Sequence, residues 1–216
     1  MEYQDNETYW IERHESLRGS LASVGKIGTP EEENRQRYAR KKRKVVDLLR
    51  SLGRLDLAGA QVLDAGCGVG MISELFYALG ADVSGVDASP IAVAEACDRS
   101  KPPPHRGGSF KVGSLLDFSF STKFDLTFCL DVLYHIIDDA NWKEAVRNLA
   151  SVTKPNGYLI IIDHLKVSPE RPAPHAHFRT KAMYDTILNE LGALECTPQG
   201  HGEFLVYSAG DFRWHS

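Results

Sequence analysis

The stretch at residues 61–72 restricts the possible folds of this chain more than any other feature. Its sequence, QVLDAGCGVGMI, is an apolar run that ends in Asp64, followed by glycines at positions 66, 68 and 70 and by the start of a helical pattern. A strand, a glycine turn and a helix in this order bring backbone N–H groups close to a bound ligand. We therefore expect residues 61–72 to build a ligand site at the carboxyl end of a buried strand.

The rest of the chain alternates strand-like and helix-like segments. Apolar, β-branched runs predict strands at 82–87, 110–112, 124–130 and 158–162, and a terminal hairpin at 194–197 and 203–208. The run at 158–162 is expected to be the central strand of the sheet, covered on both faces. Helices are expected near 6–18, 30–52 with Thr29 as N-cap, 90–100, 141–152 and 180–191, with a Pro- and His-rich connection at 164–178. Alternating strands and helices predict an α/β fold with a mainly parallel sheet.

Length and composition exclude several classes of protein. The chain has 216 residues, 43% of them hydrophobic and 25% charged, as in an ordinary single-domain globular protein. It holds no apolar run of roughly 20 residues, so we expect no membrane association. The four cysteines are scattered, which predicts free thiols in a reducing compartment and a cytoplasmic location. The net charge of −4 argues against a nucleic-acid partner.

The glycine spacing distinguishes between two kinds of ligand. A dinucleotide site has G-x-G-x-x-G, whereas this chain has Met71 in the third glycine place and a glycine at position 70 instead. Asp64 would repel a pyrophosphate but suits an ammonium group. Asp87, which ends the next strand, is placed to accept both hydroxyls of a ribose. A ligand with an amino-acid end, a ribose and no phosphate fits this pattern, and S-adenosylmethionine is such a ligand.

At this point the chain resembles the class I S-adenosylmethionine-dependent methyltransferases. The resemblance covers about residues 60–165, in the family's order and spacing, and includes VLDAGCGVG at 62–70, GVDAS at 85–89, FDLTFCLDVLYHI at 124–136 and KPNGYL at 154–159. It implies a Rossmann-like, doubly wound, seven-stranded sheet whose last strand is antiparallel. It also implies an N-terminal helical lid, here residues 1–55, over a cofactor-binding domain at residues 56–216.

The resemblance assigns cofactor-binding roles residue by residue. The methionine end of S-adenosylmethionine, and of the product S-adenosylhomocysteine, would lie on the glycine turn, and Asp87 would hold the ribose. Members of this family often have an aspartate beside the adenine after the third strand, where this chain has Ser114. The full set of implied cofactor-binding residues is Asp64, Gly66, Cys67, Gly68, Gly70, Asp87, Ala88, Ser89, Ser114, Leu115 and Leu130, with Asn34 and Tyr38 as lid contacts.

Three residues near the expected acceptor side are candidates for catalysis. His164 follows the strand at 158–162, and its ordinary pKa of about 6.5 suits proton removal at neutral pH. His135 and Tyr134 follow the strand at 124–130, where His135 is either a base or a structural hydrogen-bonding group. The aromatic residues Tyr3, Tyr9, Trp10 and Phe178 either line an acceptor pocket or belong to the core.

Metal binding and nucleic-acid binding are weaker interpretations of the remaining polar residues. Asp131, Asp163 and His164 occupy strand ends where catechol-type methyltransferases hold Mg²⁺, but a third oxygen ligand is missing, so we expect no metal. His175 and His177 stand in a Pro-rich loop and are interpreted as loop residues. The basic run at 40–44 is interpreted as a solvated helix face, with an RNA or acidic acceptor as the alternative.

The sequence therefore predicts methyl transfer to an oxygen, nitrogen or carbon atom of a small-molecule acceptor, by a monomer or homodimer. A macromolecular acceptor stays open, although two features argue against it. The Asn/Asp-Pro-Pro-aromatic run of base-modifying enzymes is replaced by Leu-Asp-Val-Leu at 130–133, and the paired glutamates of protein-arginine enzymes have no counterpart, since residues 125–143 contain no glutamate. A protein that binds the cofactor without catalysis and a dehydrogenase are the alternatives from other classes.

Overall fold

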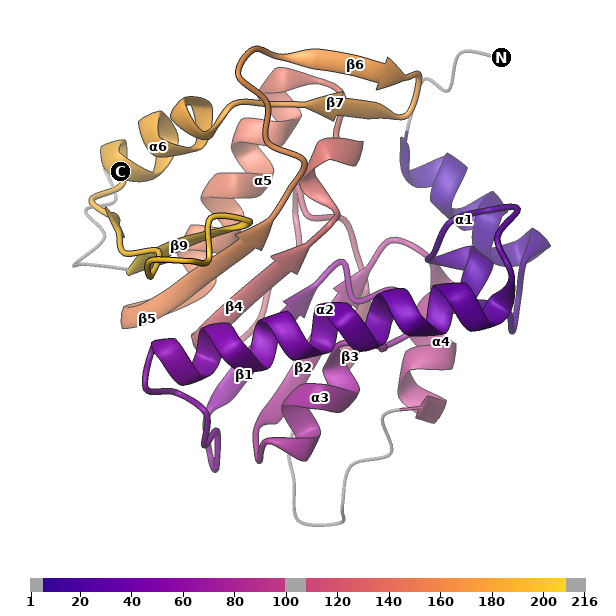
Figure 1. The fold of residues 1–216 in the computed structure, drawn as a ribbon, viewed down its shortest axis with the longest axis horizontal. Coiled ribbons are helices and arrows are strands. Elements are labelled where there is room, and N and C mark those ends of the chain that lie inside the picture. The colour runs from indigo at the N-terminus through magenta and orange to yellow at the C-terminus, as the bar shows by residue number, and fades with distance from the viewer. Residues whose placement is uncertain (1–5, 100–107, 209–216) are drawn as a thin grey trace.

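The computed structural model describes residues 6–99 and 108–208, which contain one seven-stranded sheet with helices on both faces (Figure 1). The strand order is β3-β2-β1-β4-β5-β9-β8. The first five of these run parallel, and β9 runs antiparallel to both β5 and β8, as predicted. The strands are β1 (Gln61–Ala65), β2 (Asp82–Asp87), β3 (Phe110–Val112), β4 (Phe124–Leu130), β5 (Thr153–Ile162), β8 (Leu194–Glu195) and β9 (Phe204–Ser208).

Alternate side chains of the parallel strands enter two separate cores. In β1, Val62 joins the cluster under one face and Leu63 the cluster under the other. Successive side chains of a strand point to opposite faces, so near-continuous apolar runs belong to strands covered on both sides. The helices are α1 (Asn6–Ser16), α2 (Glu31–Ser51), α3 (Ser73–Ala78), α4 (Pro90–Arg99), α5 (Asp139–Val152) and α6 (Lys181–Glu190).

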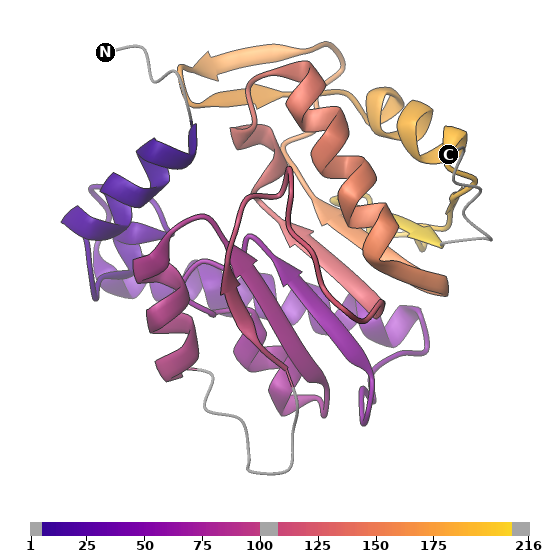
Figure 2. The same ribbon diagram turned by 180° about the vertical axis from the view of Figure 1, so that it is seen from behind.

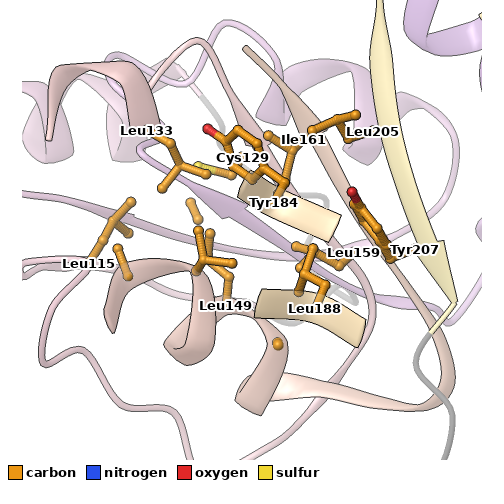
Figure 3. Packing of buried hydrophobic residues seen from close by; sticks show 14 of the residues in the cluster. Leu115, Cys129, Leu133, Leu149, Leu159, Ile161, Tyr184, Leu188, Leu205 and Tyr207 are labelled. Carbon is orange, nitrogen blue, oxygen red and sulfur yellow. The ribbon is translucent and has the colours of Figure 1, made fainter. Parts of the chain in front are cut away.

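Helices α2 and α3 cover one face of the sheet, and α5 and α6 cover the other (Figures 1 and 2). On the second face, Leu149 of α5 and Leu188 of α6 pack toward Leu159 and Ile161 of β5 (Figure 3). None of the helices in the described part of the chain has the length and apolar character needed to cross a membrane.

Two helix starts and one strand position differ from the predictions. Pro30, not Thr29, is the N-cap of α2, because Pro30 has extended backbone and the Thr29 hydroxyl donates to the Lys26 carbonyl instead. Helix α5 begins two residues earlier than predicted, since the Asp138 side chain caps it. The middle strand of the sheet is β4 rather than β5, although β5 is covered on both faces.

The Pro- and His-rich connection also contains structure that its composition did not predict. Strands β6 (Glu170–Ala173) and β7 (Ala176–Phe178) form a separate two-stranded antiparallel hairpin. Figure 1 shows this hairpin and α1 beyond the arrowheads of the parallel strands. Short 3-10 helices at Leu21–Ser23 and Leu133–His135 lie in the loops on the same side. The carboxyl edge of the sheet is therefore covered by α1 from the N-terminal part of the chain and by the hairpin that follows β5.

Candidate functional site

The three glycines of the turn after β1 all have left-handed backbone, which explains their spacing. Their φ values are +73° at Gly66, +51° at Gly68 and +77° at Gly70. Space is also short, because a Cβ at position 66 would overlap the methyl groups of Val132, and one at position 68 would lie 2.8 Å from Cγ1 of Val24. The turn therefore requires glycine for its conformation and for the close approach of neighbouring segments.

Two buried carboxylates stand on either side of this turn. The Ser73 hydroxyl donates to Oδ2 of Asp64 at 2.6 Å, and burial raises the pKa of Asp64 to about 6. The backbone N–H of Gly68 donates to Oδ2 of Asp87 at 2.8 Å, and that of Ser89 donates to Oδ1 at 3.0 Å. Burial also raises the pKa of Asp87. The glycine turn and Asp87 thus form one connected unit at the ends of β1 and β2.

A cavity of about 1160 Å³ opens above this unit. Of the predicted cofactor-binding residues, only Gly70 and Ser89 are missing from its wall. These two have supporting contacts: the Gly70 N–H donates to the Cys67 carbonyl, and the Ser89 hydroxyl accepts the Ala92 N–H at the start of α4. The predicted residues in the wall are Asn34, Tyr38, Asp64, Gly66, Cys67, Gly68, Asp87, Ala88, Ser114, Leu115, Leu130, Tyr134, His135 and His164.

The N-terminal segment closes one side of the cavity through a network of polar contacts. Arg13 of α1 donates to the carbonyl oxygens of Ala22 and Gly25, the first at 2.7 Å. The buried amide of Asn34 contacts both backbone groups of Lys26, at 2.9 and 3.1 Å. The Tyr38 hydroxyl donates to the Val24 carbonyl at 3.0 Å. The polar ends of Asn34 and Tyr38 are therefore used to hold the loop at residues 22–26.

Ser114, the predicted adenine contact, also has a local partner. Its hydroxyl accepts the N–H of Leu116 at 3.1 Å, and the N–H of the preceding Gly113 donates to the Asp87 carbonyl at 3.0 Å. The loop after β3 is thereby attached to the end of β2. This places Ser114 and Leu115 in the same cavity wall as Asp87 and Ala88.

Aromatic rings line the other side of the cavity. Tyr134, His164 and Phe178 are in mutual contact, with ring centroids 4.9 to 5.5 Å apart. Trp10 of α1 meets His135 edge to face at 4.6 Å. The neighbouring stacked pair is Tyr9 with His175, at 4.7 Å. Tyr3, which was grouped with these rings in the sequence, lies outside the described residues.

The two candidate histidine bases have different surroundings. Nδ1 of His135 donates to the His175 carbonyl at 2.9 Å, and burial lowers the pKa of His135 to about 4. His135 is therefore neutral, with its free lone pair on Nε2. His164 is exposed, and its backbone N–H donates to Oδ1 of Asp163 at 2.6 Å. The buried Asp163, whose pKa burial raises to about 6, also accepts a hydrogen bond from the Tyr184 hydroxyl.

The acidic and basic residues considered for metal or nucleic acid are mostly paired. Lys41 forms an ion pair with Asp131, whose φ of 59° is unusual for a residue other than glycine. Residues 6–99 and 108–208 contain no group of three side chains arranged to hold a metal ion. Two further lysines of the basic run are also paired, Lys42 with Glu74 at 2.7 Å and Lys44 with Glu203 at 3.3 Å.

Sequence reasoning did not identify His14 as a site residue. His14 lies one helical turn after Trp10 on α1, is 2% exposed and belongs to the cavity wall. The four-residue spacing of Trp10 and His14 puts both on one face of the helix, and that spacing was the signal in the sequence. Arg13, which ties α1 to the loop at residues 22–26, was also missed.

A protein-family model described as a methyltransferase domain matches residues 33–209, which is most of the chain. The chain belongs to this family. The match begins near the start of α2 and ends just after β9, so this methyltransferase domain includes the whole sheet. The resemblance stated from the motifs is confirmed.

Curated relatives of this methyltransferase domain include two ubiquinone biosynthesis O-methyltransferases. The mitochondrial protein of Schizosaccharomyces pombe is 35% identical over 106 residues, which are 48% of this chain and 38% of that protein. The protein of Xanthomonas euvesicatoria pv. vesicatoria is 36% identical over 110 residues, 50% of this chain and 44% of that protein. This chain therefore matches only about two fifths of the length of these relatives.

Solved structures share the fold over nearly the whole chain. Magnesium protoporphyrin IX methyltransferase from Synechocystis PCC 6803, solved with bound S-adenosylmethionine, matches with a TM-score of 0.70 and 23% identity, covering 94% of this chain and 95% of that one. The N-methyltransferase NodS from Bradyrhizobium japonicum WM9, in complex with S-adenosylhomocysteine, matches with a TM-score of 0.60 and 24% identity, covering 91% and 98%. The predicted Rossmann-like fold of the methyltransferase domain is confirmed.

Proposed function

We propose that this protein binds S-adenosylmethionine and transfers its methyl group to an oxygen, nitrogen or carbon atom of a small molecule. The observation that carries the proposal is the geometry of Asp87. Both of its carboxylate oxygens are fixed by backbone N–H groups, yet the residue lies in the cavity wall beside the glycine turn. A carboxylate retains lone pairs after two such bonds, so Asp87 can still accept the two hydroxyls of a ribose.

The other end of the cofactor fits the glycine turn. Asp64 is buried, and its pKa of about 6 leaves it mainly ionised at neutral pH, which complements an ammonium group. Met71, which occupies the third glycine place of a dinucleotide turn, packs with Leu21 and Ala92. A buried acid and a packed methionine at these positions favour an amino acid over a pyrophosphate, and this argues against a dehydrogenase.

The ring-lined side of the cavity is the proposed acceptor site. When bound, S-adenosylmethionine supplies an electrophilic methyl group on a sulfonium centre. The residues of the chain must hold the acceptor in line with that group and exclude water. Tyr134, His164 and Phe178 form the wall for this task. Burial raises the pKa of Tyr134, so its hydroxyl remains a hydrogen-bond donor at neutral pH.

Proton removal from the acceptor, where it is needed, is assigned to His164. It follows β5 at the rim of the cavity and is exposed. His135 is the weaker candidate, since a group with a pKa of about 4 has little affinity for a proton at neutral pH. An acceptor that is already anionic or a free amine needs no base, and positioning then supplies the rate enhancement.

The organisation and partners of the protein complete the proposal. Residues 1–55 act as the lid and 56–216 as the cofactor-binding domain, which agrees with the contacts of Gly19 with Glu95 and of Lys41 with Asp131 between the two parts. A small acceptor fits a basic run in which three of the five side chains are ion-paired. We further propose a monomer or homodimer in the cytoplasm, where the unpaired state of all four cysteines would be kept.

The test is transfer of a labelled methyl group from S-adenosylmethionine to three separate fractions: small metabolites, RNA and protein. The proposal predicts label in the metabolite fraction. Label in RNA or protein would replace the small acceptor by a macromolecule. Cofactor binding without transfer to any fraction would indicate a non-catalytic binding protein, and enhanced NADH fluorescence without cofactor binding would indicate a dehydrogenase.

A further inference from the structure

His14 of α1 is a buried polar side chain that lacks a partner. Both of its ring nitrogens are closed off from solvent, and neither forms a hydrogen bond with any residue in the described ranges 6–99 and 108–208. Buried polar groups are nearly always hydrogen-bonded, so each exception calls for a physical explanation. His14 also belongs to the wall of the large cavity, which points to a ligand as that explanation.

The charged groups around His14 place it at the ribose end of the cavity. Burial lowers the pKa of His14, while the carboxylate of Asp87, the backbone of Trp10 one turn earlier and the carboxylate of Glu95 oppose this, and Arg13 adds to it. Glu95 accepts the backbone N–H of Gly19 at 3.0 Å, and Arg13 is bonded to loop carbonyls. Asp87 is therefore the neighbour that shares the cavity wall with His14 and still has lone pairs to offer a ligand.

The geometry points to His14 as the second half of the ribose site, with an imidazole N–H that donates to a ribose hydroxyl whose own proton is accepted by Asp87. This inference rests on the proposed function, because it assumes that S-adenosylmethionine is the ligand. It adds a cofactor-contacting residue that comes from α1 rather than from the sheet. The ribose would then lie between the end of β2 and the N-terminal helix.

The chemistry of a hydroxyl group supports this arrangement. A hydroxyl both donates and accepts, whereas a carboxylate only accepts, so the lone pairs of a ribose hydroxyl bound to Asp87 need a separate donor. Two backbone donors beside Asp87, the N–H groups of Gly68 and Ser89, are already used to fix its carboxylate. A neutral imidazole carries one N–H and can supply that donor. The same contact would satisfy a ring nitrogen of His14 that is otherwise unpaired.

The arrangement also gives α1 a role in cofactor affinity. Helix α1 is held to the loop at residues 22–26 by Arg13, and Gly19, just after the helix, is held to α4 by Glu95. Packing of α1 in this position would thus complete the ribose site from the side opposite the sheet. Removal of the His14 donor should weaken binding only of ligands that carry the hydroxyl it contacts.

The experiment is calorimetric titration of S-adenosylhomocysteine and of its 2′-deoxy and 3′-deoxy forms into the full chain. The variants are His14→Phe, which keeps a ring but loses the donor, and His14→Gln, which keeps an N–H donor. Glu12→Gln, at an exposed position on the same helix, is the matched control. Circular dichroism and thermal unfolding establish that each variant is folded.

We expect His14→Phe to weaken S-adenosylhomocysteine binding by about three- to tenfold, the effect of one neutral hydrogen bond. The loss should vanish for the deoxy analogue that lacks the contacted hydroxyl, and His14→Gln should recover part of the affinity. An equal loss for all three ligands would show that His14 only packs, and an unchanged affinity would show that it makes no contact; either result overturns the inference.

Asp87→Ala separates failure of this inference from failure of the proposed function. If the wild-type protein binds S-adenosylhomocysteine and Asp87→Ala does not, the cofactor site stands and the His14 variants decide the inference alone. If the wild-type protein does not bind it, the proposed function fails and the inference fails with it. Should His14→Phe be unfolded, His14→Leu, which also lacks a donor, gives the same comparison with the two deoxy ligands.

Discussion

Replacement of Gly66 by alanine should destabilise the protein through two effects that can be separated. The φ of +73° costs about 1–2 kcal/mol for any residue with a Cβ. The added Cβ would also overlap the methyl groups of Val132, with Cγ1 at 2.8 Å, and overpacking of this kind costs about 1–3 kcal/mol. We therefore expect Gly66→Ala to lower the free energy of unfolding by about 2–5 kcal/mol.

Urea unfolding of a small set of variants measures each effect. Gly28 also has a positive φ, of +78°, but a Cβ there would have open space around it, so Gly28→Ala should show the backbone cost alone. In a double-mutant cycle, Val132→Ala should remove the overlap and recover the larger part of the excess cost at position 66. The reasoning is refuted if Gly66→Ala costs no more than Gly28→Ala, or if Val132→Ala leaves the cost unchanged.

Two other predictions concern the carboxylates and the proposed base. The pKa of Asp64 is raised by burial from 3.8 to about 6, so the native state holds a proton that the unfolded state has lost between about pH 4 and 6. The contribution of Asp64 to the free energy of unfolding should thus fall by about 3 kcal/mol as the pH rises through this window. Urea denaturation at pH 4 and pH 7 measures this fall, and Asp64→Asn should remove it. Asp163 is the matched control, because its pKa is raised in the same way but it lies outside the cavity wall. Asp163→Asn should change stability in the same way and leave cofactor affinity unaltered, whereas Asp64→Asn should weaken cofactor binding. Equal cofactor affinities for the two variants would contradict the assignment of Asp64 to the cofactor site. His164→Ala should lower the turnover number more than the affinity for S-adenosylmethionine, and an unchanged turnover number would transfer the role of base to His135 or remove it.

The sequence predicted the strands of the sheet well because their signal is local. The runs at 82–87, 110–112 and 124–130 match β2, β3 and β4 at both ends. β2 and β4 are buried along most of their length, and such strands are mainly apolar, whereas the short β3 is largely exposed. The order of the strands has no such local signal. The most β-branched run, in β5, was therefore placed at the middle of the sheet, which β4 occupies.

The errors at helix starts and in the roof of the cavity have a common origin in tertiary contacts. Thr29 has the composition of an N-cap, but its hydroxyl is used by Lys26, and Pro30 takes the cap position. The β6–β7 hairpin is rich in Pro and His and has little strand propensity of its own. Its β7 strand is instead attached through contacts such as the hydrogen bond between His177 and the Ile137 carbonyl.

The candidate site also contains some residues that the sequence could place and others that depend on tertiary contacts. Asp64, the glycines and Asp87 were identified because their positions at strand ends fix where they lie in a parallel sheet. Asn34 and Tyr38, expected as lid contacts to the cofactor, lie in the cavity wall, but the sequence did not show that the loop at residues 22–26 uses their polar groups. The spacing of Trp10 and His14 marks one face of α1, but the packing of α1 against α4, which decides where that face points, has no signal within α1.

The most direct test of the account is calorimetric titration of S-adenosylmethionine into the wild-type protein, Asp87→Ala and Asp82→Ala. Asp82 begins the strand that Asp87 ends, so its variant tests the opposite end of β2. Hydrogen bonds to charged groups are worth about 1.5–3 kcal/mol each, and loss of two should weaken binding by at least a hundredfold. We expect one bound cofactor per wild-type chain, the same affinity for Asp82→Ala, and that loss for Asp87→Ala. An Asp87→Ala protein that binds S-adenosylmethionine as tightly as the wild type would contradict the account.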